Sequence, residues 1–101
     1  MFIKGRKTII NMEAIKIIKI ERYSYCCKIQ AYDFDDNKYT LLLIPDVEIK
    51  HNMAGTLNDY DIAKIIIGTI FNKKNNDIDL LEIADYFNEE YKIKNKILTL
   101  I

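Results

Sequence analysis

The hydrophobic pattern of the chain changes its period once, close to Pro45, and this change limits the folds available. Before Pro45, short apolar runs rich in β-branched residues are separated by charged or glycine-containing turns, which is typical of strands. After it, apolar residues recur every three or four positions, as on one face of a helix. Strands followed by helices indicate an α+β fold, and 101 residues, half of them hydrophobic, fit a single domain over residues 1–101.

Four or five strands are expected within residues 2–44. Short turns connect them, so an antiparallel meander is the simplest topology. The segments 26–33 and 38–44 have the clearest strand pattern, and their pairing places Ile29 and Ala31 on the face that meets the core.

The segment 14–21 is also rich in β-branched residues, but its alternation is interrupted. Ile15 and Ile17 share one face, whereas Ile18 and Ile20 share the other. Either both faces of this strand are covered, or a β-bulge near Ile17 resets the register.

Two helices are predicted after a polar loop, at residues 59–74 and 79–91, both packed on one face of the sheet. Asn58 or Asp59 and then Asp79 stand where helix N-caps are expected. Residues 97–101 either continue a helix or form a short C-terminal strand at the sheet edge, and we favour the edge strand.

The first predicted helix carries more apolar surface than one face of a sheet can cover. Its apolar side chains form two adjacent stripes, and Gly68 would permit close contact with another element. We therefore expect a protein partner or a homodimer at this helix. The candidate interface residues are Ile65, Ile66, Gly68, Thr69 and Phe71.

Charge is distributed unevenly along the chain. Residues 1–28 carry seven Lys and Arg against two Glu, and residues 29–101 carry eight Lys against thirteen Asp and Glu, so +5 and −5 cancel. Opposite charges can meet across a folded surface, or the basic half can bind nucleic acid. The candidate residues for a nucleic-acid face are Lys4, Arg6, Lys7, Lys16, Lys19, Tyr23 and Tyr25.

The stretch LLEIADYFN, residues 80–88, resembles the first helix of a helix-turn-helix unit, with Ala84 as the small residue on which the next helix packs. The resemblance implies a degenerate unit over residues 61–94, in which Glu89 and Glu90 would face phosphate. At the level of the fold, a strand meander capped by a helix also occurs in pleckstrin-homology-like folds, and this analogy implies no function.

The acidic stretch AYDFDDNKYT, residues 31–40, has alternating oxygen donors like a calcium-binding loop. Lys38 stands where such a loop needs glycine, and Ile44 stands where it needs glutamate. The four residues FDDN are instead typical of a hairpin turn. We expect Asp35 and Asp36 to lie in water at the tip of this hairpin.

Cys26 and Cys27 are adjacent, and neighbouring strand residues point to opposite faces, so we expect two reduced thiols. Their spacing does not match a zinc site, and His51, the only imidazole, lies in a polar loop where it should be solvated. We therefore predict no catalytic residue, no metal site and no cofactor. A pocket joining His51 to either cysteine would favour an enzyme instead.

The N-terminal sequence does not resemble a secretory signal, and IIIGTIF (65–71), an uncharged apolar run, is too short to span a membrane, so we expect a cytoplasmic protein. Isoleucine, lysine and asparagine make up 42 of the 101 residues, which fits an AT-rich genome. The favoured hypothesis is a small non-enzymatic interaction protein, an accessory, regulatory or inhibitor protein of a bacterium or its mobile elements. The alternative is a nucleic-acid-binding regulator that uses the basic sheet face or the degenerate helix-turn-helix.

Overall fold

The computed structural model describes residues 1–50, 55–73 and 76–101. An antiparallel sheet followed by two helices confirms the predicted α+β fold class, and both helices begin and end within two residues of the predicted bounds. The elements, in chain order, are β1 (Phe2–Lys4), β2 (Ile9–Asn11), the 3-10 helix η1 (Met12–Ala14), β3 (Ile15–Arg22), β4 (Cys26–Asp33), β5 (Lys38–Pro45), β6 (Glu48–Lys50), β7 (Thr56–Asn58), α1 (Asp59–Asn72), β8 (Ile78–Asp79), α2 (Leu80–Glu90) and β9 (Leu98–Thr99).

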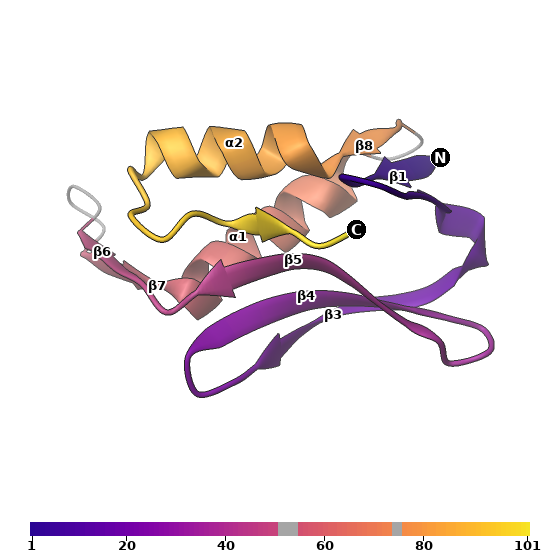
Figure 1. The fold of residues 1–101 in the computed structure, drawn as a ribbon, viewed down its shortest axis with the longest axis horizontal. Helices are drawn as coiled ribbons and strands as arrows, with labels where there is room; N and C mark the ends of the chain where they lie inside the picture. Colours follow the sequence, from indigo (N-terminus) through magenta and orange to yellow (C-terminus); the bar gives the residue numbers. More distant parts are fainter. Residues whose placement is uncertain (51–54, 74–75) are drawn as a thin grey trace.

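The main sheet has the strand order β3-β4-β5-β9, and all of its pairs are antiparallel. β9 pairs with β5 through Leu42 opposite Thr99 and Leu43 opposite Leu98, so the end of the chain forms an edge strand, as predicted. β3 forms the opposite edge and lies at the lower margin of the molecule in Figure 1.

The remaining short strands lie outside the main sheet. β1 and β2 form an antiparallel hairpin, and β1 also pairs in parallel with β8. The turn of this hairpin contacts the other end of the chain, because the Arg6 amide donates to the Ile101 carbonyl. β6 and β7 form a two-stranded sheet within the segment whose composition predicts only a polar loop.

The β3 strand contains a β-bulge between Ile15 and Ile17, which is the interruption that its sequence predicts. Beyond the bulge the register with β4 is regular, with Ile20 opposite Ile29. A second bulge lies in β5, where Leu41 is the extra residue opposite β4.

The Asp33 carboxylate closes the β4–β5 hairpin. Its Oδ1 accepts from the backbone amides of Asp35 (2.9 Å) and Asn37 (2.8 Å), and its Oδ2 accepts from the Asn37 side-chain amide (2.9 Å) and the Tyr39 hydroxyl (3.1 Å). These bonds, the one from the Asn37 side chain above all, lower the pKa of Asp33. The carboxylate therefore organises a turn, and Asp35 and Asp36 are exposed at its tip, as predicted.

The two helices cover the apolar face of the main sheet from one side. α1 packs against β3, β4 and β5, and α2 packs against β9, β5 and β1 (Figure 1). Asn58 begins α1 with a capping box to Asp61, and Asp79 caps α2. Ile29 and Ala31 are fully buried on the covered face, as predicted. The core also contains Leu42, Ile44, Ile62, Ile66, Ile70, Leu80, Ile83 and Phe87.

We expect Ile66→Ala to lower the free energy of unfolding by about 2–5 kcal/mol, because the Ile66 side chain has no exposed surface and its truncation leaves a cavity. Ile65→Ala, one position earlier and 40% exposed, is the matched control and should cost less than about 1 kcal/mol. Urea denaturation followed by circular dichroism measures both. Equal losses would contradict the orientation of α1 on the sheet.

Candidate interaction surface

The residues proposed as an interface on α1 lie on different sides of the helix. Ile66 faces the core, whereas Thr69 lines a groove of about 170 Å³ together with Tyr86 and Phe87 of α2. Ile65 lies one turn before Thr69, whose hydroxyl donates to the Ile65 carbonyl (3.0 Å), so both belong to the flank near α2. Gly68 lies outside the core, and apart from its chain neighbours and the adjacent helix backbone no described atom lies within 4 Å of the position that a Cβ would take.

Phe71 belongs to the opposite flank of α1, the one that faces β3. It lines an open groove of about 320 Å³ whose other wall is the beginning of β3. Phe71 is 54% exposed and Ile17, on that wall, is 47% exposed, so the groove presents apolar side chains to water. The groove is lined by Met12, Ile15, Lys16, Ile17, Ile18 and Phe71.

The outer edge of β3 runs beside this groove and is open. Among the described residues, only β4 pairs with β3, and it pairs on the inner side. An unpaired edge of eight residues presents a row of free backbone donors and acceptors, which is a template for another strand. We refer to the edge of β3 together with the groove as the β3 margin.

The face of the sheet away from the helices carries a cluster of polar side chains around Glu21. Glu21 accepts hydrogen bonds from the hydroxyls of Tyr32 and Tyr23, the latter at 2.8 Å. The Lys19 ammonium lies 4.9 Å from the centroid of the Tyr32 ring and 3.9 Å from the Glu21 carboxylate. We call Lys19, Glu21, Tyr23, Lys28 and Tyr32 the outer-face cluster.

Gln30 lies on this same face, yet it is completely buried. The long side chains of the outer-face cluster explain the burial, because Lys and Tyr cover neighbouring surface with their stems and rings. The hydrogen bond to Glu21 raises the pKa of the Tyr23 hydroxyl, and the nearby Gln30 amide offsets part of this rise. The Gln30 amide itself makes no hydrogen bond of ordinary geometry. The alternation of β4 accounts for the face on which Gln30 lies, opposite to that of Ile29 and Ala31, but not for its burial.

Hydrogen bonding within the cluster shifts the pKa values of its members in opposite directions. The Tyr32 hydroxyl, and after it the Tyr23 hydroxyl, lowers the pKa of Glu21, because both bonds favour the charged carboxylate. The same bond to Glu21 raises the pKa of Tyr32 to about 12. The cluster is thus stable as a carboxylate with two neutral phenols.

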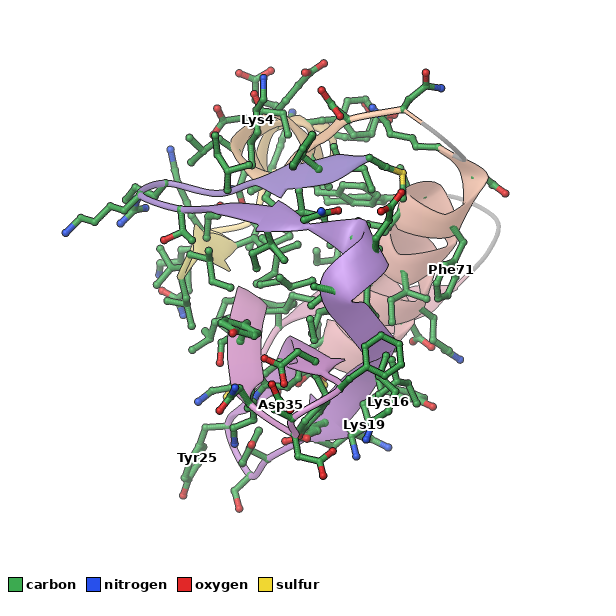
Figure 2. All side chains as sticks on the ribbon, turned by 90° about the vertical axis from the view of Figure 1, so that its right-hand side faces the viewer. Lys4, Lys16, Lys19, Tyr25, Asp35 and Phe71 are labelled. Atoms are coloured by element: carbon green, nitrogen blue, oxygen red, sulfur yellow. The ribbon has the colours of Figure 1, made fainter. Side chains whose placement is uncertain are left out.

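The residues proposed as a nucleic-acid face lie in two places. Lys4 is at the end of the β1–β2 hairpin, whose turn carries Arg6 and Lys7, whereas Lys16 and Lys19 lie together at the opposite end of the view in Figure 2. Lys16 forms an ion pair with Asp36, and Lys19 lies near Glu21. Tyr23 belongs to the outer-face cluster, and Tyr25 is 82% exposed in the β3–β4 turn.

In its described residues, the segment that resembles a helix-turn-helix contains α1 and α2 but no third helix. After α2 the chain turns through Lys92, which has a positive φ of 49°, and ends in β9. Residues 91–101, all of which the structure describes, are therefore turn, irregular chain and strand at the place where a recognition helix would stand.

The two cysteines are free thiols in different environments. Cys26 is half-buried on the outer face, and Cys27 is fully buried on the core face. Burial, and then a hydrogen bond to the Asp59 carboxylate, raises the pKa of Cys27 to about 12. This thiol therefore stays protonated and unreactive near neutral pH.

Neither a cluster of metal-ligand side chains nor a membrane-spanning helix occurs in the described part of the chain. Within residues 1–50, 55–73 and 76–101, no three His, Cys, Asp or Glu side chains gather to hold a metal ion. In the same ranges, no helix has the length and apolar character needed to cross a membrane. His51 lies outside the described residues, so its predicted place in a solvated loop stays a prediction.

Comparison of the chain with family models, with curated proteins and with solved structures gives no match. The β3 margin, which combines an open edge with an apolar groove, is the feature that sequence reasoning missed. Its signal was the bulge near Ile17, because β-bulges are frequent at sheet edges.

We expect iodoacetamide at pH 8 to modify Cys26 in the native protein and to leave Cys27 unmodified. Alkylation needs the thiolate, and Cys27 is both buried and held by its raised pKa in the thiol form. Peptide mass spectrometry measures the two positions separately. Both should react in guanidinium chloride, and equal rates in the native protein would contradict the placement of Cys27.

We expect Tyr32→Phe to raise the pKa of Glu21 towards its ordinary value, because the main hydrogen bond to the carboxylate is lost. In the parent protein, a lowered carboxyl pKa stabilises the fold above the unfolded pKa, and this contribution is lost as the pH falls through the folded pKa. NMR titration of the Glu21 carboxyl carbon measures the shift. Tyr39→Phe, which removes a donor from Asp33 instead, is the control and should leave Glu21 unchanged.

Proposed function

We propose that the chain is a small, non-enzymatic, cytoplasmic protein that acts through protein–protein contacts, and that it self-associates. In this proposal the chain serves as an accessory, regulatory or inhibitor protein of a bacterium or its mobile elements. The β3 margin is its binding surface. The sequence predicts an interface over the whole apolar face of α1. The proposed surface includes only the flank of α1 that borders β3, which carries Phe71.

The observation that carries the proposal is the juxtaposition of an open strand edge and an apolar groove. Each alone is common, but together they offer backbone hydrogen bonds and a place for apolar side chains, which is how edge strands bind peptides and subunits. Phe71 gives the groove an exposed aromatic side chain of the kind that anchors interfaces. The two unbridged thiols agree with a reducing compartment.

The rival function, nucleic-acid binding, has weaker support. Phosphate binding depends on basic groups that act together, and the proposed groups are divided between the β1–β2 hairpin and β3. Carboxylates already lie near the ammonium groups of Lys16 and Lys19, and the Arg22 guanidinium lies 4.6 Å from the centroid of the Tyr60 ring.

We expect Phe71→Asp to weaken self-association about tenfold or more, because it places a charge in the apolar groove. Ile65→Asp introduces the same charge on the other flank of α1, and it should leave association unchanged. Sedimentation velocity over roughly 1–100 µM protein measures both constants.

A monomeric parent protein over this range would contradict self-association. A stronger effect of Ile65→Asp than of Phe71→Asp would move the surface to the groove near α2. Retention of the parent protein on heparin, lost with rising salt, would favour the nucleic-acid alternative.

A further inference from the structure

We infer that the partner at the β3 margin is a second copy of this chain, which adds its own β3 antiparallel to the first with the twofold axis at Ile20. The two main sheets then become one continuous sheet. This inference rests on the proposed self-association and specifies its geometry. Four constraints taken together select this register.

The first constraint is the direction of the backbone groups. The Tyr23 amide donates to the Cys26 carbonyl (2.9 Å), so the backbone groups of Tyr23 point towards β4. These groups alternate along an antiparallel strand, and those of Glu21 and Lys19 therefore also point towards β4. The backbone groups of Ile18, Ile20 and Arg22 point to the open edge, where a second strand can bind them.

The second constraint is the length of regular strand. The bulge between Ile15 and Ile17 ends the regular geometry on one side, and the turn after Tyr23 ends it on the other. The regular segment is therefore 17–23, and Ile20 is its midpoint. A twofold axis at Ile20 uses the whole segment, whereas an axis at Ile18 would pair Glu21 with Ile15 and so cross the bulge.

The third constraint is that the buried faces of both sheets must lie on the same side. A twofold axis perpendicular to the sheet keeps each face of the sheet on its own side. Residues that lie opposite each other across the two strands must therefore belong to the same face. Ile18 and Ile20 lie opposite Ala31 and Ile29 and belong to the core face, whereas Lys19 and Glu21 belong to the outer face. The axis must therefore pass through a residue and not between two residues.

The fourth constraint is charge. An axis at Lys19 places the two Lys19 side chains opposite each other, and an axis at Glu21 does the same with the two Glu21 side chains, so both are unfavourable. An axis at Ile20 places Lys19 of each copy opposite Glu21 of the other. Only this register converts the charges of β3 into attractive pairs.

The same register also covers exposed apolar surface. It places Ile17 opposite Tyr23 of the second copy, and these two side chains are 47% and 46% exposed in the single chain. Beyond this pair, the β3–β4 turn of the second copy, which carries the exposed Tyr25, arrives beside the groove lined by Phe71. The contacts thus include both parts of the β3 margin.

Charge reversal tests the register. We expect Lys19→Glu to weaken dimerisation about tenfold, because it creates two like-charge pairs across the axis, and Glu21→Lys to do the same. The double variant Lys19→Glu/Glu21→Lys restores opposite charges and should return the dimer to near the affinity of the parent protein. Sedimentation equilibrium gives the constants, and circular dichroism confirms that each variant is folded.

Lys4→Glu is the matched control, because Lys4 is also an exposed strand lysine but lies far from Lys19 (Figure 2). It should leave dimerisation unchanged. If Phe71→Asp dissociates the dimer but neither charge reversal affects it, the proposed surface stands and the register is wrong. If the parent protein is monomeric, both proposals fail.

Amide hydrogen exchange gives a readout that does not depend on substitution. The outward amides of Ile18, Ile20 and Arg22 should exchange more slowly as protein concentration rises, because they become hydrogen-bonded only in the dimer. The inward amides of Lys19 and Glu21 bond to β4 in the single chain and serve as the internal control. Protection that does not depend on concentration at the three outward amides would overturn the inference.

Discussion

The structure depends on the cover that α1 gives to one face of the β3–β4–β5 meander. Ile29 and Ala31 of β4 are fully buried because α1 packs on β4, and Ile62, Ile66 and Ile70 of α1 belong to the same core. A single helix of 14 residues covers the middle of a sheet and not its whole width. α2 extends the cover towards β9, so the margin at β3 is left with an open edge and a shallow groove. The β3 margin is therefore exposed because the two helices cover the other parts of the sheet.

The elements that sequence reasoning predicted are those whose pattern extends over several residues. The eight-residue strand β4 shows its alternation, β5 shows as a continuous apolar run that ends at Pro45, the bulge in β3 shows as a break in alternation, and the capped helices show their period. The elements that it missed are short. β8 has two residues and β6 and β7 have three each, which is too few to carry a period. The pairing of β8 with β1 also joins segments that lie far apart in the sequence.

The candidate site was predictable only in outline. The width of the apolar stripe on α1 indicated surplus hydrophobic surface, but the sequence cannot tell which flank faces which neighbour. The structure divides that surplus between Ile66 in the core, Thr69 beside α2 and Phe71 beside β3. Similarly, the basic count of residues 1–28 is correct, but folding separates Lys4 from Lys16 and Lys19 (Figure 2). These basic residues are close in the sequence, but they do not lie on one face of the folded protein.

The lysines of β3 raise an objection to strand pairing, because exposed lysines on edge strands usually prevent it. Their placement answers the objection. Lys16 lies at the bulge, next to Asp36, and takes no part in the regular segment. Lys19 opposes itself when the axis passes through it, but it opposes Glu21 when the axis passes through Ile20. In the proposed dimer, Lys19 thus disfavours a competing register and favours the one with its axis at Ile20, which is how polar side chains give specificity to an interface.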